Sequence, residues 1–126
     1  MRGARHWLSC WERGVLMPYI PHQGDIVFID FNPQAGHEQA GKRPALVVSN
    51  DSYNKHTNMA IVCPITNTEN AFPLHIRLDD RTATTGVILC EQVKALDLNA
   101  RNASFKESLP TDLLQEVLEC IILSIE

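Results

Sequence analysis

The sequence predicts a mainly β protein, a small twisted β-barrel with one α-helix at its C-terminal end. Between residues 25 and 96, short stretches rich in Val, Ile and Phe follow one another at close intervals, separated by Pro, Gly and Asn. This is the pattern of short strands joined by turns. Helical spacing of apolar residues is clear in the last segment of the chain, which predicts a helix packed on the barrel.

The fold is expected to begin near Gly24 with a strand over residues 25–31, which carries apolar side chains on both of its faces. A second, mostly apolar strand is expected over residues 44–49 and a third over residues 59–66. Because proline lacks an N–H group, Pro64 predicts that the third strand is an edge strand or contains a bulge.

The next strand is expected over residues 72–78, with His75 on its exposed face as an ordinary surface residue. Residues 86–93 form the following strand, which we expect to continue through Leu96. The final helix begins near Pro110, a residue that suits a first turn, and Asp112 complements its dipole. Its apolar stripe consists of Leu114, Val117, Leu118, Ile121, Ile122 and Ile125.

Residues 1–17 differ from the rest of the chain. They contain both tryptophans, show no structural period, and end at a second Met. We therefore expect a dispensable N-terminal extension, with the folded domain over residues 18–126.

Composition bounds the class of protein. A chain of 126 residues with 44% hydrophobic and 21% charged residues is typical of one globular domain. It has no apolar run near the roughly 20 residues of a membrane helix, and residues 1–17 do not resemble a secretory signal, so we expect a cytoplasmic protein. The four cysteines are widely spaced without a CxxC motif, which predicts reduced thiols and no metal site.

The net charge of −4 lacks the basic balance usual in nucleic-acid-binding proteins, although a local cluster of cations can still bind phosphate. One such place is the end of the polar loop at residues 34–42, where Lys42 and Arg43 precede a buried strand. Pro44 restricts Arg43 to extended conformations. The alternative for Arg43 is a surface salt bridge.

Several blocks, taken in order, resemble the PemK/MazF family of toxins. They are Gly24 with Asp25, and then DFNP at 30–33, GHEQ at 36–39, GKRP at 41–44, VVS at 47–49, VCPIT at 62–66, TGV at 85–87 and EQV at 91–93. The resemblance covers roughly residues 19–125. It implies an SH3-like barrel, a homodimer, sequence-specific cleavage of single-stranded RNA, a role in growth arrest and a cognate antitoxin.

By the resemblance, Arg43 and Thr66 match the family's catalytic arginine and threonine. Three further residues compete for proton transfer: His37 and Glu91, which match a histidine and an acid of the PemK branch, and Glu38 beside His37. That branch has an arginine two positions before the acid, where this chain has Leu89. No cofactor or metal is expected, because the 2′-OH of RNA can attack the adjacent phosphorus when a base, an acid and a cation are in place.

The residues expected to contact RNA are polar side chains near these blocks: Glu38, Gln39, Lys42, Asn54, Lys55 and Gln92. Lys55 follows Asn54 in an expected polar turn, where solvation is the alternative. Gln92 either contacts RNA or pairs within the sheet.

Two other functions are considered. The first is a CcdB-like toxin of the same barrel fold, which binds DNA gyrase without catalysis. The second is an SH3-like peptide-binding module, which is disfavoured because aromatic residues make up 6% of the chain and both tryptophans lie in the extension.

Overall fold

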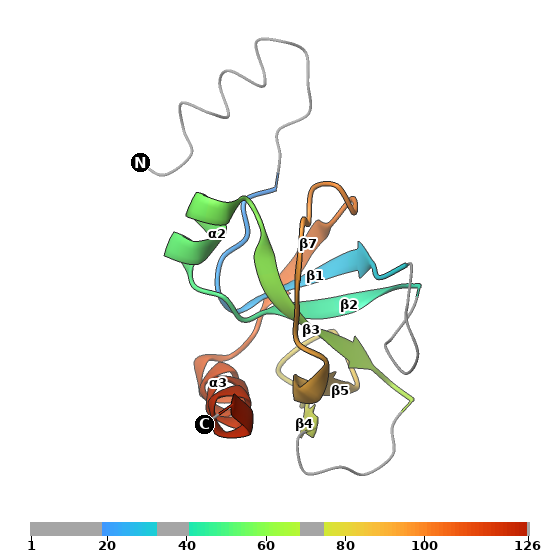
Figure 1. Ribbon diagram of the computed structural model, residues 1–126. Helices are drawn as coiled ribbons and strands as arrows, with labels where there is room; N and C mark the ends of the chain where they lie inside the picture. The colour runs from blue at the N-terminus through green and yellow to red at the C-terminus, as the bar shows by residue number, and fades with distance from the viewer. Residues whose placement is uncertain (1–18, 33–40, 69–74, 126) are drawn as a thin grey trace.

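The computed structural model describes residues 19–32, 41–68 and 75–125 (Figure 1). The expected extension at 1–17 and the site candidates His37, Glu38 and Gln39 lie outside these residues. The elements are β1 Asp25–Asp30, β2 Lys42–Val47, α2 Asp51–Thr57, β3 Ala60–Thr66, β4 His75–Arg77, β5 Val87–Leu89, the 3₁₀ helix η1 Cys90–Gln92, β6 Lys94–Leu96, β7 Ser104–Ser108 and α3 Thr111–Ile125.

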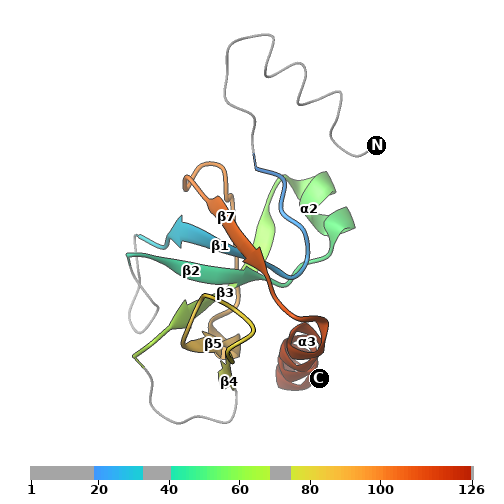
Figure 2. The same ribbon diagram turned by 180° about the vertical axis from the view of Figure 1, so that it is seen from behind.

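The seven strands form one strongly twisted antiparallel sheet with the order β4-β5-β3-β2-β1-β7, and β6 also pairs with β3. In the two opposite views of Figures 1 and 2, α2 and α3 lie at the two ends of the molecule. The predicted mainly β class with a C-terminal helix is confirmed. Within the described residues, α3 and the other helices are not long and apolar enough to cross a bilayer.

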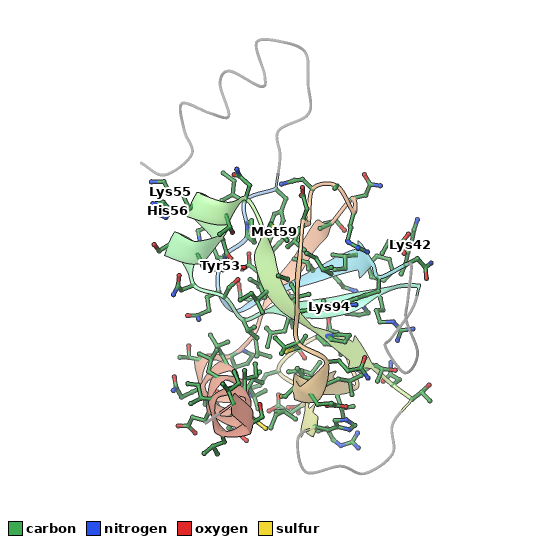
Figure 3. The ribbon with its side chains drawn as sticks, in the orientation of Figure 1. Lys42, Tyr53, Lys55, His56, Met59 and Lys94 are labelled. Carbon is green, nitrogen blue, oxygen red and sulfur yellow. The ribbon has the colours of Figure 1, made fainter. Side chains whose placement is uncertain are left out.

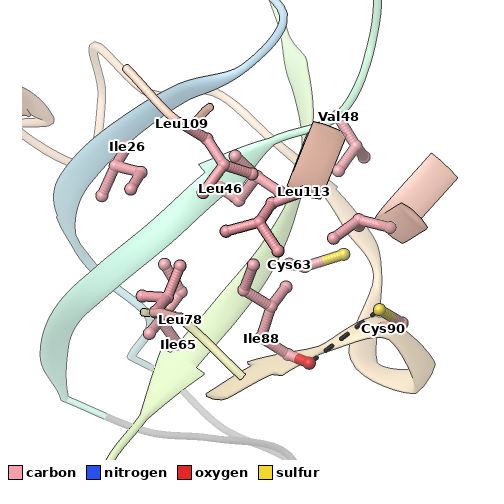
Figure 4. Close-up of a cluster of buried hydrophobic side chains, with 11 residues drawn as sticks. Ile26, Leu46, Val48, Cys63, Ile65, Leu78, Ile88, Cys90, Leu109 and Leu113 are labelled. Carbon is pink, nitrogen blue, oxygen red and sulfur yellow. Dashed lines mark hydrogen bonds between the residues drawn. The ribbon is translucent and has the colours of Figure 1, made fainter. Parts of the chain in front are cut away.

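The strands β1, β2 and β3 bury side chains on both of their faces, which explains their nearly continuous apolar sequences. One face packs under α3 and forms the helix-side core (Figure 4): Ile26, Leu46, Val48, Cys63, Ile65, Leu78, Ile88, Cys90, Leu109, Leu113 and Val117. The other face forms a second core: Val27, Ile29, Phe31, Ala45, Val47, Ala60, Val62, Leu96 and Leu98.

The cysteines of the helix-side core act as apolar residues. Cys63, Cys90 and Cys120 are free thiols. Burial, with smaller contributions from Glu91 and Cys120, raises the pKa of Cys63 to about 12. Burial also raises the pKa of Cys90, whose Sγ lies 3.9 Å from the Ile88 carbonyl oxygen (Figure 4). These two thiols therefore stay protonated at neutral pH and contribute to packing.

Strand β3 is central, so of the two alternatives predicted from Pro64, an edge strand or a bulge, the edge strand is wrong. One side of β3 pairs with β2, including Pro64 opposite Ala45. Its other side pairs first with β6, up to Val62, and then with β5, from Ile65 onwards. Pro64 falls between these two partners, where the missing N–H group removes no bond from either ladder.

Sequence patterns missed two elements and joined two others. The expected continuous strand from 86 to 96 is interrupted by η1. The short helix α2 has no apolar period, but Asn50 caps it by accepting a 2.8 Å bond from the Tyr53 N–H. The edge strand β7 is mostly exposed and polar, so it gives no alternating pattern.

Asn54 was expected to contact RNA, but its side chain is buried inside the fold and is 4% exposed. Its Nδ2 donates to the carbonyl oxygens of Pro21 at 3.2 Å and Ser49 at 3.3 Å, and its Oδ1 accepts from the Ser49 hydroxyl. The same hydroxyl accepts from the N–H of Ile61 at 2.9 Å. Asn54 therefore connects α2 to β3, through the Ser49 hydroxyl, and to the segment before β1, through Pro21.

We predict that Asn54→Ala lowers the free energy of unfolding by about 2 kcal/mol, because it leaves buried carbonyl and hydroxyl groups without partners. Lys55→Ala, at the next and exposed position of α2, is the matched control and should change stability by less than about 0.5 kcal/mol. Chemical denaturation measures both. Equal stability of the two variants would contradict the structural role of Asn54.

Candidate active site

Arg43 and Thr66, the two residues for which the resemblance implies a catalytic role, lie on neighbouring strands. Arg43 is in β2 and is partly buried, and Thr66 ends β3 with 6% of its surface exposed. The antiparallel ladder between these strands places Ala45 opposite Pro64. The same register, continued by two residues, places Arg43 opposite Thr66. Residues opposite each other in an antiparallel pair point to the same face, so the guanidinium and the hydroxyl share one face of the sheet.

The turn before β5 holds the backbone of Thr66 in place. Gly86 has a φ of +114°, and a Cβ atom at this position would lie 2.4 Å from the carbonyl oxygen of Thr66. Any other residue would therefore be strained and would collide with the end of β3. Beside it, the Thr85 hydroxyl donates to Asn67 Oδ1 at 3.1 Å, and Thr66 Oγ1 accepts from the Thr68 N–H at 3.1 Å. The position of Thr66 thus depends on a glycine that adds no chemistry of its own.

The face that carries Thr66 continues across β5 to β4. Val87 lies opposite Thr66 in one ladder and opposite Arg77 in the next, and Leu89 lies opposite His75. These side chains share a face because the strand period is two residues. The residues between them, among them Ile65 and Ile88, point the other way into the helix-side core.

His75 and Glu91 are in contact, with His75 Nε2 3.0 Å from Glu91 Oε2, within hydrogen-bond distance. The His75 side chain is 11% exposed and that of Glu91 is 31% exposed. The prediction that His75 is an ordinary surface residue is therefore wrong. The prediction failed because no sequence period indicated η1. This turn follows β5 and brings Glu91 next to His75, the first residue of β4.

The remaining candidates are spread over the molecule. Lys42 is exposed at the start of β2, beside Arg43, and Gln92 is half-buried in η1. Lys55 lies on α2, on the opposite side of the molecule from Lys42 in Figure 3. Thus the structure brings Lys42, Arg43 and Thr66 to the same end of two strands and separates Lys55 from them.

The arrangement suits chemistry on a phosphodiester. A guanidinium can bind two phosphate oxygens at once, and a hydroxyl beside it can bind a third or orient an attacking group. An imidazole–carboxylate pair, such as His75 with Glu91, contains the types of group that take part in general acid–base catalysis. In residues 19–32, 41–68 and 75–125 there is no group of three or more His, Cys, Asp or Glu side chains placed to hold a metal ion.

Comparison with known sequences finds a matching family and named relatives. The family described as "PemK-like, MazF-like toxin of type II toxin-antitoxin system" matches residues 22–125. The chain is 38% identical over 97 residues to the endoribonuclease toxin MazF of Escherichia coli K12, covering 77% of this chain and 86% of that protein. It is 35% identical over 100 residues to the endoribonuclease PemK of Escherichia coli, covering 76% of this chain and 75% of that protein.

Solved structures agree. MazF from Deinococcus radiodurans has a TM-score of 0.80 and 36% identity, with 85% of this chain and 97% of that chain covered. A MazE–MazF complex from the same organism matches with a TM-score of 0.75 and 34% identity over 85% of this chain and 97% of that chain. The chain therefore belongs to the PemK-like, MazF-like family of toxins of type II toxin–antitoxin systems.

Proposed function

We propose that this chain, an endoribonuclease toxin, cuts single-stranded RNA at specific sequences without a metal ion and thereby arrests growth. The observation that carries the proposal is the register that places Arg43 opposite Thr66 on one face of β2 and β3. The alternative function, a CcdB-like toxin that binds gyrase, is disfavoured, because relatives that cover most of the chain are named endoribonucleases.

In this proposal the substrate supplies its own nucleophile. The 2′-OH attacks the adjacent phosphorus, the bond to the 5′ oxygen breaks, and the products end in a 2′,3′-cyclic phosphate and a 5′-OH. Arg43 binds the non-bridging oxygens and stabilises the charge that grows on them in the transition state. Thr66 binds a phosphate oxygen or positions the 2′-OH.

Proton transfer needs a base for the 2′-OH and an acid for the leaving 5′ oxygen. Glu91 is the described candidate, and His75 holds its carboxylate from β4 at 3.0 Å. His37 and Glu38 remain candidates outside the described residues. The position where the PemK branch has an arginine is the buried Leu89, so this chain does not share that part of the PemK arrangement.

The RNA-binding surface that we propose includes Lys42 and Gln92, together with Glu38 and Gln39, which lie outside the described residues. Lys55 stays a candidate for a more distant contact along the RNA. Asn54 is left out, because its amide is buried and bonded within the fold.

We infer that the protein acts in the cytoplasm, where its partner is a cognate antitoxin that occupies the RNA-binding groove with a flexible segment. Such a segment gains affinity by folding on binding. Support comes from the MazE–MazF complexes among the similar structures. We also propose a homodimer, since the C-terminal part of α3 leaves apolar side chains exposed, namely Ile122, Leu123 and Ile125.

We predict that Arg43→Ala abolishes cleavage, lowering kcat at least about a hundredfold, because it removes charge stabilisation from the transition state. Thr66→Ala should lose a smaller but still large factor, and Thr66→Ser should retain more activity than Thr66→Ala because it keeps the hydroxyl. Initial rates on a defined RNA are compared with the melting temperature of each variant. Near-normal turnover by a folded Arg43→Ala protein would remove this residue from the site.

We predict that Gly86→Ala lowers kcat/KM about a hundredfold and also destabilises the protein, because the new Cβ displaces the Thr66 carbonyl. Gly41→Ala is the matched control. Gly41 also has a positive φ, +78°, but a Cβ there meets nothing within 4 Å. It should therefore show the cost of backbone strain, about 1 kcal/mol, without displacing Thr66. Equal activity losses in the two variants would contradict the positioning role of Gly86.

We predict that cleavage survives EDTA and depends on a single ribose hydroxyl of the RNA. Replacing the ribose on the 5′ side of the cut by deoxyribose should abolish cleavage and leave binding largely intact, because it removes only the nucleophile. The measurement is product analysis by gel and mass spectrometry, with chelator present. Efficient cleavage of the deoxy substrate, or inhibition by EDTA that an added metal reverses, would refute the mechanism.

A further inference from the structure

The side chain of Arg101 bonds to the backbone at the end of β1. Arg101 lies in the turn between β6 and β7, and its Nη1 donates to the carbonyl oxygens of Asp30 at 3.0 Å and Asn32 at 2.8 Å. We propose that Arg101 is a positioning residue of the active site, which holds the end of β1 and, through it, the start of β2. This inference rests on the proposed ribonuclease function and adds to it a residue that acts through the backbone.

The two bonds of Arg101 replace strand pairing that β7 does not provide. β1 pairs with β7 as far as Phe28 and then continues to Asp30. The Phe31 N–H donates towards β2. Because the N–H and C=O of one peptide group point in opposite directions, the Asp30 carbonyl faces away from β2. The carbonyl of Asn32, two residues later, faces the same way, so one guanidinium nitrogen can bind both.

The end of β1 is bonded in turn to the residue that precedes β2. The Asn32 Oδ1 accepts from the Gly41 N–H at 3.0 Å, and the Gly41 carbonyl oxygen accepts from the Phe31 N–H at 2.9 Å. The first two residues of β2, Lys42 and Arg43, lie in register with the last two residues of β1. A short chain of hydrogen bonds therefore connects Arg101 with the start of β2.

The start of β2 depends on β1 more than the rest of that strand does. Further along, β2 has two partners, because its ladder with β3 begins at Ala45, opposite Pro64. Before Ala45, the register with β1 determines where the backbone of Arg43 lies. A shift of 1 Å in a catalytic group can cost about a hundredfold in rate. The position of Arg43 relative to Thr66 is therefore sensitive to the end of β1, which Arg101 holds.

The turn that carries Arg101 is well suited to hold another segment. The Asp97 Oδ1 accepts from the N–H groups of Asn99 and Ala100, each at 3.1 Å, and the Asp97 carbonyl oxygen accepts from the Arg101 N–H at 3.2 Å. The Arg101 side chain is half-buried, and a charged donor forms stronger hydrogen bonds than a neutral one. Loss of this donor leaves two carbonyl oxygens of β1 without their protein partner.

The test compares two residues of this turn that each bond twice to the backbone. Asn99 is the matched control, because its side chain accepts from the Tyr19 N–H at 2.9 Å and donates to the Tyr19 carbonyl oxygen at 3.1 Å, and neither bond involves β1. For the wild type, Arg101→Met, Arg101→Lys and Asn99→Ala, kcat and KM are measured on an RNA whose cleavage site has been mapped, together with the melting temperature.

Two further measurements separate positioning from direct contact with RNA. Amide hydrogen exchange at Phe31 and Gly41, followed by NMR, reports on the strand ends without any substrate. The Kd for the same RNA with one deoxyribose at the cut is measured between about 50 and 200 mM salt, because each phosphate contact adds to the slope of log Kd against log salt.

We expect Arg101→Met to lower kcat about thirtyfold with a smaller change in KM, because the catalytic groups are misaligned. Exchange at Phe31 and Gly41 should become at least about tenfold faster, because the strand ends open more often. Arg101→Lys should recover part of kcat, since an ammonium has several donors for the two carbonyl oxygens. Asn99→Ala should lower the melting temperature but keep kcat within about twofold of the wild type.

The outcomes separate this inference from the proposed function. If the wild-type protein cuts no RNA, the proposed function is wrong, and the exchange rates alone decide whether Arg101 holds the strand ends. The inference is overturned if folded Arg101→Met has the kcat of the wild type, or if Asn99→Ala loses kcat equally, because the loss then follows stability. It is also overturned if Arg101→Met leaves exchange unchanged and reduces the salt slope by about 0.7, which indicates a direct phosphate contact.

Discussion

The change of partner along β3 is the constraint on which the site depends. The first half of this strand pairs with β6 and its end pairs with β5, while β2 follows its other side. Pro64 lies at the change, where a missing N–H group costs nothing. A strand that stayed with β6 would leave Thr66 without the β5 neighbour. Because β3 moves to β5, Thr66 lies between β2 and β5, with Arg43 on one side and Val87 on the other.

The fold could be predicted from sequence wherever burial imposes a period. β1, β2, β3 and α3 each bury apolar side chains against a core, and each was located within a few residues. The elements that were missed, α2 and β7, are held by caps and by backbone pairing with neighbours and bury little apolar surface of their own. η1 was missed for a related reason, since a single turn has no period and depends on the strands on either side of it.

The site divides in the same way. Arg43 and Thr66 were chosen as candidates because ordered sequence blocks resemble a family, and the ladder between β2 and β3 places these two proposed residues on one face. Asn54 and His75 were both expected to be exposed to solvent, whereas the structure buries most of each side chain. The polar sequence around Asn54 suggested an exposed turn, whereas its amide bonds to three groups inside the fold. Alternation placed His75 on an exposed face, whereas Glu91 covers it from η1. Contacts between residues distant in sequence decide both cases.

The acidic balance of the chain is compatible with RNA binding because several carboxylates have structural partners. Arg81 binds both Asp79, at 2.8 Å, and Asp112 at the start of α3, at 2.9 Å, and these bonds lower the pKa of both carboxyl groups. The Glu107 carboxylate accepts bonds from the N–H groups of Ala83 and Thr84 and from the Thr84 hydroxyl. Burial opposes the charge of Glu107, but these bonds together lower its pKa. These bonds connect the loop before β5 to α3, through Asp112, and to β7, through Glu107. That loop includes Gly86, which lies against the Thr66 carbonyl, so these acids help to position Thr66, the residue that we propose to contact the phosphate.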